Sequence, residues 1–379
     1  MQHKTWVEIS ASALKKNSHA LHSILNDGVT FCAVVKANAY GHDLDTIVRF
    51  LLLEHIDHFA VDSIDEAELV RKRAPNAEIF ILGYTPPERI KDVISNQCIQ
   101  TVYDLDTLSM IAKDALELQE KAKINIKIET GTRRQGIELS ALEPFLRTIK
   151  QLERDLILVG ISSHFADAEN ANDRSFTESQ NTLFEQARDK ATALGFAPKY
   201  IHISCSASGI LTPETQHSMV RFGIAMYGLW SSDSLKSVNR VSNRAIDLSP
   251  VLSWKTRIAQ IKDIPPRVPI GYSHGFISDR PMRIAILPIG YYDGFTRSNK
   301  GKGKVLIRGQ QCQLIGNICM NMCMADVSTM PQLKVGEIAT ILGKDGMHQI
   351  STEDIAQRTN TINYEVVTSI NPLLPRIVV

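Results

Sequence analysis

The chain has 379 residues, with 42 Lys and Arg against 41 Asp and Glu, so its formal net charge at pH 7 is +1. This balance argues against nucleic acid or an anionic membrane surface as a partner, because both favour proteins with an excess or a cluster of basic residues. The length is sufficient for a barrel of ordinary size and a second, smaller domain.

The N-terminal residues Met1–Glu8 lack the basic start and the apolar core of a secretory signal peptide. No apolar run approaches the roughly 20 residues that a membrane span needs. We therefore expect a soluble, cytoplasmic protein. The six cysteines include no Cys-x-x-Cys pair, which favours buried free thiols over disulfides and predicts no metal site.

Short apolar runs alternate with helical segments through the first 230 residues. A strand at Thr5–Ile9 comes first, followed by Ser10 as a helix N-cap. Eight further strands, separated mostly by helices, predict an α/β fold of the (β/α)8 barrel type. An open doubly wound sheet is the alternative, although no Gly-x-Gly-x-x-Gly follows the first of these eight strands. The predicted barrel strands are Thr30–Lys36, His58–Ser63, Ile79–Gly83, Ile99–Tyr103, Ile124–Glu129, Leu156–Ser162, Tyr200–Cys205 and Met219–Tyr227.

The composition shifts to Ser, Asn and Asp around Leu229–Asn243, which we interpret as a domain junction. The remaining chain predicts a mainly-β domain, with one capped helix at Ser351–Arg358. The predicted domains are residues 1–235 and 236–379, and the strand at about residues 5–9 could also pack with the second domain. The predicted later strands are Val251–Ile261, Met282–Pro288, Lys304–Ile307, Cys312–Ile315, Ile318–Asp326 and Glu337–Leu342.

Lys36 ends the first barrel strand, at the edge where α/β proteins place their ligand sites. Partial burial there favours the neutral amine, which suits Schiff-base chemistry with a carbonyl compound or with pyridoxal phosphate. Position alone is also compatible with a lysine that extends into water. The wider string VKANAYGH, residues 35–42, resembles the pyridoxal-phosphate attachment signature of the alanine racemase family. Asp43 departs from this signature, which usually has a second glycine there.

A phosphate site is expected after the seventh and eighth strands, where such barrels usually bind phosphate. The small residues of 204–209 would suit it, although a surface turn is the commoner use of such a string. The family resemblance implies that the phosphate is held by Ser206, by the backbone of Gly223 and Ile224, and by Tyr40 and Tyr364. Cys205 replaces the asparagine that is usual in the family.

The resemblance also implies roles for four residues in proton transfer. Arg221 matches the arginine that points at the pyridine nitrogen of the cofactor, and because arginine only donates, that nitrogen must stay unprotonated. Lys36 would serve one face of the planar intermediate and Tyr272 the other. A tyrosine has a pKa near 10, so it needs help to act as a base. His164 matches the histidine that the family places between this tyrosine and the arginine.

Further matches concern the substrate. Arg134 corresponds to an arginine near the cofactor phenol oxygen and the substrate carboxylate, and Lys127 to a lysine that is carbamylated in some members. Tyr291 corresponds to a tyrosine that narrows the entrance, and Met320 to a residue whose backbone N–H meets the substrate carboxylate. Asn321 replaces a common aspartate and suggests altered specificity.

The resemblance runs from Trp6 to Arg376 and implies an amino-acid racemase that interconverts L- and D-alanine, with D-alanine destined for cell-wall peptide. It also implies a homodimer in which the tyrosine comes from the partner subunit. Three alternatives remain: a broad-specificity or serine-preferring racemase, a barrel-type decarboxylase, and a non-catalytic carrier of pyridoxal phosphate. Arg221 argues against the decarboxylase, and Tyr272 argues against the carrier.

Overall fold

The computed structural model describes residues 3–379, which divide into two compact units. Residues 14–39 and 44–249 form one, which we call the barrel unit. Residues 40–43 and 250–379, together with the described residues up to 13, form the other, which we call the β unit. Within residues 3–379 no helix combines the length and the apolar character that crossing a membrane requires.

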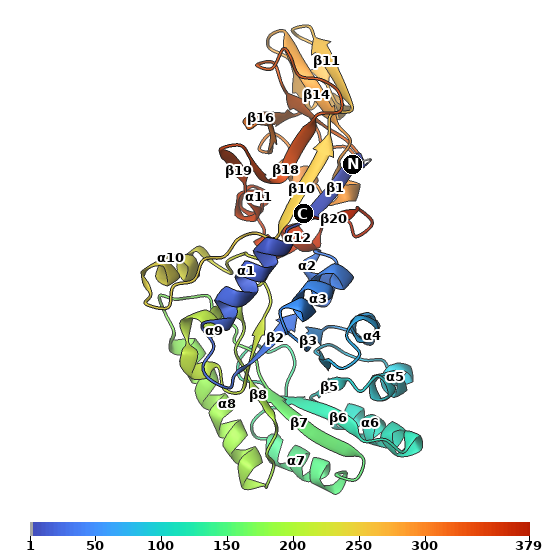
Figure 1. Cartoon of the computed structure of the whole chain (residues 1–379), viewed down its shortest axis with the longest axis vertical. Helices are drawn as coiled ribbons and strands as arrows, with labels where there is room; N and C mark the ends of the chain where they lie inside the picture. Colours follow the sequence, from blue (N-terminus) through green and yellow to red (C-terminus); the bar gives the residue numbers. More distant parts are fainter. Residues whose placement is uncertain (1–2) are drawn as a thin grey trace. The chain divides into compact units, whose positions relative to one another are not determined.

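The barrel unit is built on a parallel sheet. Over the described residues its eight strands follow in the order β8-β7-β6-β5-β4-β3-β2-β9, so the first and last strands in the chain are neighbours. β2 and β9 pair from Thr30 with Met219 to Ala33 with Phe222. The strands, labelled in part in Figure 1, are β2 (Thr30–Val34), β3 (His58–Val61), β4 (Glu78–Ile81), β5 (Ile99–Val102), β6 (Ala122–Lys127), β7 (Leu156–Ser162), β8 (Tyr200–His202) and β9 (Met219–Phe222).

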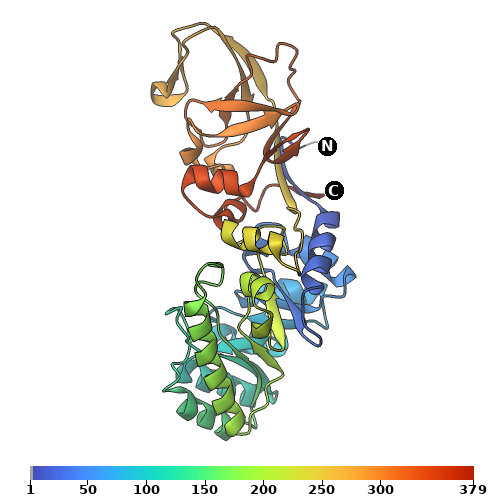
Figure 2. The same cartoon turned by 90° about the vertical axis from the view of Figure 1, so that its left-hand side faces the viewer.

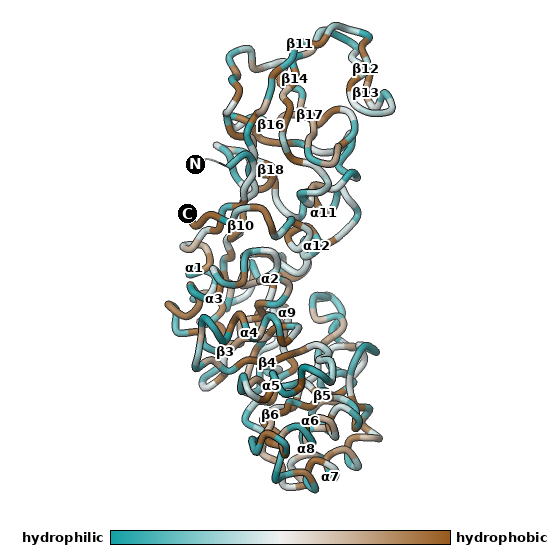
Figure 3. Tube along the Cα trace, turned by 90° about the vertical axis from the view of Figure 1, so that its right-hand side faces the viewer, coloured by the Kyte–Doolittle hydropathy of each residue, from teal (hydrophilic) through white to brown (hydrophobic). Residues whose placement is uncertain are grey.

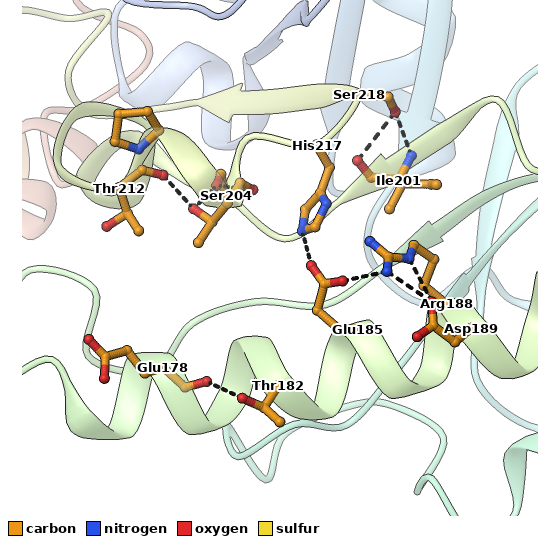
Figure 4. A network of polar contacts seen from close by, with 12 residues as sticks. Glu178, Thr182, Glu185, Arg188, Asp189, Ile201, Ser204, Thr212, His217 and Ser218 are labelled. Carbon is orange, nitrogen blue, oxygen red and sulfur yellow. Dashed lines mark hydrogen bonds and ion pairs between the residues drawn. The ribbon is translucent and has the colours of Figure 1, made fainter.

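Hydrogen bonds between the segments of β8 and β9 nearly close this sheet. The Ser218 N–H donates to the Ile201 carbonyl at 3.1 Å, and the Ser218 hydroxyl accepts from the Ile201 N–H at 2.6 Å. On the outer side His217 faces Glu185 of the long helix α8 (Ser175–Ala193), at 3.6 Å (Figure 4). The predicted barrel of eight strands is therefore confirmed, in a nearly closed form.

Helices cover the strands, which explains why the strands are so apolar. The side chains of Phe59, Phe80 and Phe222 are fully buried, and Figure 3 draws β4 mostly in brown for hydrophobic residues. The helices of residues 11–241 are α1 (Ala11–His22), α2 (Lys36–Tyr40), α3 (Leu44–Leu53), α4 (Ile64–Arg73), α5 (Ile90–Ser95), α6 (Leu105–Leu118), α7 (Leu142–Gln151), α8 (Ser175–Ala193), α9 (Ser206–Leu211) and α10 (Asp233–Val241).

The β unit contains a mixed sheet in the order β11-β14-β17-β16-β15-β18-β10-β1-β20, with β19 beside β18. Its strands after residue 250 appear in yellow, orange and red in Figure 2. The predicted helix near residue 351 is confirmed as α11, and Ser351 and Asp354 form its capping box. The elements are β1 (Thr5–Ile9), β10 (Leu252–Arg257), β11 (Gln260–Ile264), β12 (Pro269–Ile270), β13 (Phe276–Ile277), β14 (Met282–Leu287), β15 (Lys304–Ile307), β16 (Gln310–Ile315), β17 (Cys323–Asp326), β18 (Ile338–Asp345), β19 (His348–Ile350), β20 (Arg376–Val378), α11 (Thr352–Thr359) and α12 (Asn363–Thr368).

Several predicted elements differ in extent. The predicted strand Val251–Ile261 is two strands, because the backbone changes partner: Ile258 N–H donates to Glu337, and Ala259 N–H donates to Ile286. The strand predicted to start at Ile318 starts only at Cys323, after a loop closed by a Cys319–Met322 hydrogen bond.

The stretch interpreted as a junction contains a helix. Ser232 accepts a hydrogen bond from the Leu235 N–H at 3.0 Å and so caps α10. The predicted boundary between residues 235 and 236 lies inside this helix, and the division into domains at that point stays a prediction.

Candidate active site

Polar side chains gather where the barrel strands end. Lys127 is the last residue of β6, Lys36 and His164 each follow a strand by two residues, and Ser206 begins α9 after β8. Arg221 lies within β9. Because the carboxyl ends of parallel strands share one face of a barrel, these groups belong to one mouth. The barrel unit thus brings together the predicted residues Lys36, Lys127, His164, Ser206 and Arg221.

Lys36 does not end its strand, as predicted, but begins a left-handed turn. β2 ends at Val34. The residues that follow Lys36, from Ala37 to Tyr40, have φ between 53° and 54°. Each non-glycine residue in this conformation costs roughly 1–2 kcal/mol. Local bonds offset part of this cost: Asn38 Oδ1 accepts from the Leu44 N–H at 2.9 Å, and the Ala39 N–H donates to the Val35 carbonyl at 2.8 Å.

The Arg221 guanidinium is buried and held by several acceptors. One terminal nitrogen donates to the His202 carbonyl at 3.1 Å and to the ring of His202. The other donates to the Ser163 carbonyl at 2.8 Å and to His164 Nδ1 at 3.2 Å. Burial lowers the pKa of Arg221, but arginine remains charged in proteins. The strand position therefore fixes a cation inside the mouth of the barrel.

These bonds define the tautomers of two histidines. A guanidinium can only donate, so Nδ1 of His164 and Nδ1 of His202 must accept. The proton of each ring then lies on Nε2, and in His202 that group donates to Asn125 Oδ1 at 3.1 Å. Burial and the charge of Arg221 lower the pKa of both histidines well below the ordinary value. Both rings are therefore neutral, and His164 presents an N–H donor.

Lys127 lies close to Arg221 and Arg134, and among the described residues no ion pair joins it to a carboxylate. Burial, followed by the charges of Arg221 and Arg134, lowers its pKa to about 8. The adjacent loop is organised by Glu129, whose carboxylate accepts from the Gly131 N–H. Backbone N–H groups of Arg133 and Arg134 also lower the pKa of Glu129, although burial opposes them. The loop therefore wraps a carboxylate and presents Arg134 to solvent.

Ser206 forms a small cradle with the end of β9. Its hydroxyl accepts from the Gly223 N–H at 3.0 Å and from the Ala225 N–H at 3.4 Å. The side chains of Ser206 and Ile224 are almost fully buried. Cys205 precedes the cradle as the N-cap of α9, and its backbone N–H donates to the Ser208 hydroxyl at 2.9 Å. Hydroxyl and backbone donors of this kind can hold a phosphate group.

The other predicted site residues belong to the β unit. Tyr272 is 74% exposed, and Met320 is 55% exposed. Tyr291 is also exposed, whereas Asn321 is partly buried. The rings of Tyr40 and Tyr364 lie 6.2 Å apart, so the β unit brings these two predicted phosphate residues together.

Sequence reasoning does not single out Asp62, Asn125 or Glu129. Asp62 Oδ1 lies 3.2 Å from Lys36 Nζ. Asn125 joins His202 to Ser162, whose hydroxyl it contacts at 2.8 Å. One signal for Asn125 was available, because it is a polar residue between Ile124 and Ile126 in a strand. Asp62 could have been found by comparing the residues that follow each strand.

The barrel mouth fits pyridoxal phosphate by the chemistry of its donors. The cofactor carries an anionic phosphate, a phenol oxygen, a ring nitrogen and an aldehyde. The mouth offers an amine at Lys36, cations at Arg134 and Arg221, and the hydroxyl cradle of Ser206. Among the described residues no group of three or more His, Cys, Asp or Glu side chains is placed to hold a metal ion.

Comparison with protein-family models gives two matches that follow each other along the chain. Residues 9–231 match the model described as alanine racemase, N-terminal domain. Residues 251–378 match the model described as alanine racemase, C-terminal domain.

Curated relatives and solved structures agree with these matches. An alanine racemase of Leptospira interrogans is 38% identical over 100% of this chain and 96% of its own length. One of Methanococcus maripaludis is 37% identical over 100% of this chain and 99% of its own. The crystal structure of a Bacillus anthracis alanine racemase with bound L-Ala-P has a TM-score of 0.93 at 30% identity, covering 100% of this chain and 96% of that one. A Clostridium difficile alanine racemase has a TM-score of 0.93 at 33% identity, with the same coverage.

Proposed function

The chain belongs to the alanine racemase family, and we propose that it interconverts L- and D-alanine with pyridoxal 5'-phosphate held by Lys36 and with Lys36 and Tyr272 as the two proton-transferring groups. Racemisation of alanine follows from the full-length relatives and the two family models.

Lys36 would hold the aldehyde carbon of the cofactor through its amine. Ser206, with the backbone of Gly223 and Ile224, would hold the phosphate. Tyr40 and Tyr364, whose rings lie 6.2 Å apart, would also bind the phosphate. When bound, pyridoxal phosphate supplies the electron withdrawal that makes the Cα proton of an attached amino acid removable.

The fixed, buried guanidinium of Arg221 is the observation that carries this proposal. Within the described contacts its two terminal nitrogens are engaged by His202, Ser163 and His164, so Nε–H is the donor that we assign to the ring nitrogen of the cofactor. A donor at this position would keep the ring nitrogen of the bound cofactor unprotonated and would limit how much negative charge the ring accepts. Prompt return of a proton to Cα is then favoured over the competing reactions of the cofactor.

Two groups would move the protons. Lys36, free of the cofactor once the substrate amine has replaced it, would accept or donate a proton on one face of Cα. Tyr272 of the partner subunit would act on the other face. The Nε2–H of neutral His164, held by Arg221, would stabilise the phenolate oxygen of that tyrosine.

Arg134 and the backbone N–H of Met320 would bind the substrate carboxylate, and Tyr291 and Asn321 would line the entrance. Lys127 would carry a carbamate: its neutral amine forms an N–C bond to carbon dioxide and releases one proton. The pKa of about 8 supports this step, because it raises the neutral fraction near pH 7. The resulting anion would pair with Arg134.

Solvent-deuterium exchange at Cα, followed by chiral analysis, tests the reaction. Purified protein is incubated in D2O with L-alanine and, separately, with L-serine. We expect exchange with D-alanine formed fastest. Faster formation of D-serine would show that serine is the preferred substrate and would make Asn321 the candidate cause of that preference. Absence of exchange with both amino acids, despite bound cofactor, would contradict the proposal.

Tyr272→Phe tests the second base. Because general acid–base groups contribute on the order of 100- to 10,000-fold, we expect kcat to fall at least about 100-fold while the cofactor stays bound. Tyr292→Phe is the matched control, since Tyr292 is also an exposed tyrosine of the β unit. Unchanged turnover of Tyr272→Phe would remove the tyrosine from the mechanism.

A further inference from the structure

The amine of Lys36 is in contact with a carboxylate from the next strand. Lys36 Nζ lies 3.2 Å from Asp62 Oδ1. β2 and β3 are paired in parallel, with Val34 opposite Ala60, so two residues further on Lys36 is level with Asp62. The register of the sheet therefore places the two side chains side by side at the mouth of the barrel.

Glu66 links the turn that follows Lys36 to Asp62. One of its carboxylate oxygens accepts from the Asn38 N–H at 3.3 Å, and the other accepts from the Asp62 N–H at 2.9 Å. Glu66 itself is held in the first turn of α4, because its N–H donates to the N-cap Ser63. One carboxylate thus ties the left-handed turn after Lys36 to the backbone of Asp62.

Gly83, after β4, limits Asp62 on the other side. The Gly83 N–H donates to the Asp62 carbonyl at 3.0 Å. A Cβ at position 83 would collide with that carbonyl and lie 3.0 Å from Asp62 Oδ2. The half-exposed carboxylate of Asp62 therefore has one oxygen beside Gly83 and the other beside the amine of Lys36.

We propose that Asp62 is a positioning residue for the amine of Lys36. The carboxylate of Asp62 accepts a hydrogen bond from the ammonium that forms when Lys36 takes the Cα proton. The step breaks the Cα–H bond, forms an N–H bond on Lys36 and leaves the electron pair on the substrate. This inference rests on the proposed function of Lys36.

The nearby cations disfavour a further positive charge on Lys36. The carboxylate of Asp62 would offset this repulsion. Loss of its carboxylate should therefore make the ammonium of Lys36 harder to form. The charged and titratable groups around Lys36 are Asp62, Glu66 of α4, Lys127 of β6, Arg134, His164 and Arg221 of β9.

Competitive labelling of the full-length apoprotein tests the contact without reference to catalysis. Trace acetic anhydride is applied across a pH series, and acetylation of Lys36 is followed by mass spectrometry. In Asp62→Asn the acetylation of Lys36, relative to an unrelated lysine, should become roughly two- to fivefold faster, because the amine loses its carboxylate partner; this size is expected for a partly exposed pair. Asp62→Glu should restore the parent value.

Asp65→Asn is the control for lost negative charge. Asp65 lies in the first turn of α4, three positions after Asp62, but pairs with Arg89 at 2.8 Å, so its loss should leave the labelling of Lys36 unchanged. If Asp62→Asn and Asp65→Asn label Lys36 as the parent protein does, the proposed contact is wrong, whatever the activity of the holoenzyme.

Isotope effects of the holoenzyme provide the second readout. With Cα-deuterated alanine, Asp62→Asn should raise kH/kD for the enantiomer from which Lys36 removes the label and lower it for the other. Both directions share the slowed Lys36 step, so kcat/KM should fall equally in each. Equal isotope effects for parent and variant would overturn the role of Asp62 but leave racemisation intact. A parent protein that does not racemise alanine would instead contradict the proposed function.

Discussion

At the scale of single residues, the buried amine of Lys127 makes the stability of the fold depend on pH. Its pKa is lowered from 10.5 to about 8 by burial and by the neighbouring arginines. Between these values the unfolded chain binds more protons than the folded one, so stability rises with pH through this window. Below pH 8 the charged amine destabilises the fold by at most about 3 kcal/mol, because one pKa unit corresponds to about 1.4 kcal/mol.

We expect Lys127→Met to raise the free energy of unfolding at pH 7 in buffer free of carbon dioxide. The gain should shrink above pH 8 and vanish near pH 10.5. Urea unfolding across pH 7–11 measures it, with Lys123→Met, on the same strand, as the control. A gain of equal size at pH 7 and pH 11 would contradict this account. Added bicarbonate should reduce the gain if the carbamate forms.

The residues that carry a family motif could be predicted individually. The groups that hydrogen-bond to these residues and hold them in place could not. Lys36, Arg221 and Tyr272 stand in distinctive strings of sequence. The acceptors around Arg221 are mostly backbone carbonyls, such as those of Ser163 and His202. Every residue type has such a carbonyl, so the sequence does not indicate which ones are used. Asp62 meets Lys36 only because of the register between two strands.

At the scale of elements, the turn after Lys36 leads into a close backbone contact. Gly41 has φ +78°, and a Cβ there would collide with the Val367 carbonyl. Gly28 has nearly the same φ, +76°, but open space around it. Substitutions at these two glycines therefore allow the cost of backbone strain to be measured separately from the cost of a collision.

We expect Gly28→Ala to cost roughly 1–2 kcal/mol, from the left-handed conformation alone. Gly41→Ala should cost at least about 2 kcal/mol more, because the Val367 backbone must move. Thermal or urea unfolding of both variants measures the difference. Similar losses would show that the segment of Val367 moves without appreciable cost.

The order of the elements was predictable and their ends were less so. Apolar runs and helix caps are local signals, so the eight barrel strands and the capped helix after Ser351 were predicted. The switch of partner between Ile258 and Ala259 depends on strands far along the chain. A continuous β-forming sequence contains no signal for such a switch.

At the scale of the whole molecule, the proposed site requires two subunits, and complementation tests this directly. A dimer of one Lys36→Ala subunit and one Tyr272→Phe subunit would contain one intact site and one with both defects. Random mixing gives half heterodimers, each with one of two sites active. We therefore expect a mixture of the two inactive variants to regain about one quarter of parental activity after subunit exchange.

If Lys36 and Tyr272 acted within one chain, the mixture would remain inactive. Dilution of the parent enzyme gives an independent measurement. Activity should fall as the subunits separate, and sedimentation of the same samples measures that separation. A monomer with full turnover would contradict the shared site.

Membership of the two units was predictable only in outline. The change from alternating strands and helices to a β-rich pattern is visible along the chain. The assignment of residues 40–43 to the β unit is not. It depends on contacts such as the hydrogen bond from Arg376 to the Gly41 carbonyl at 3.0 Å, between positions 335 residues apart.

The pairing of β1 sets an order of events during synthesis. β1 lies between β10 and β20, and Ile9 is paired with both Leu252 and Val378. At roughly 5–20 residues per second, β1 leaves the ribosome tens of seconds before the last of its partners exists. An apolar strand that includes the fully buried Trp6 therefore waits with both edges open while the barrel forms. Until β10 and β20 have been synthesised, β1 is therefore open to misassociation along both edges.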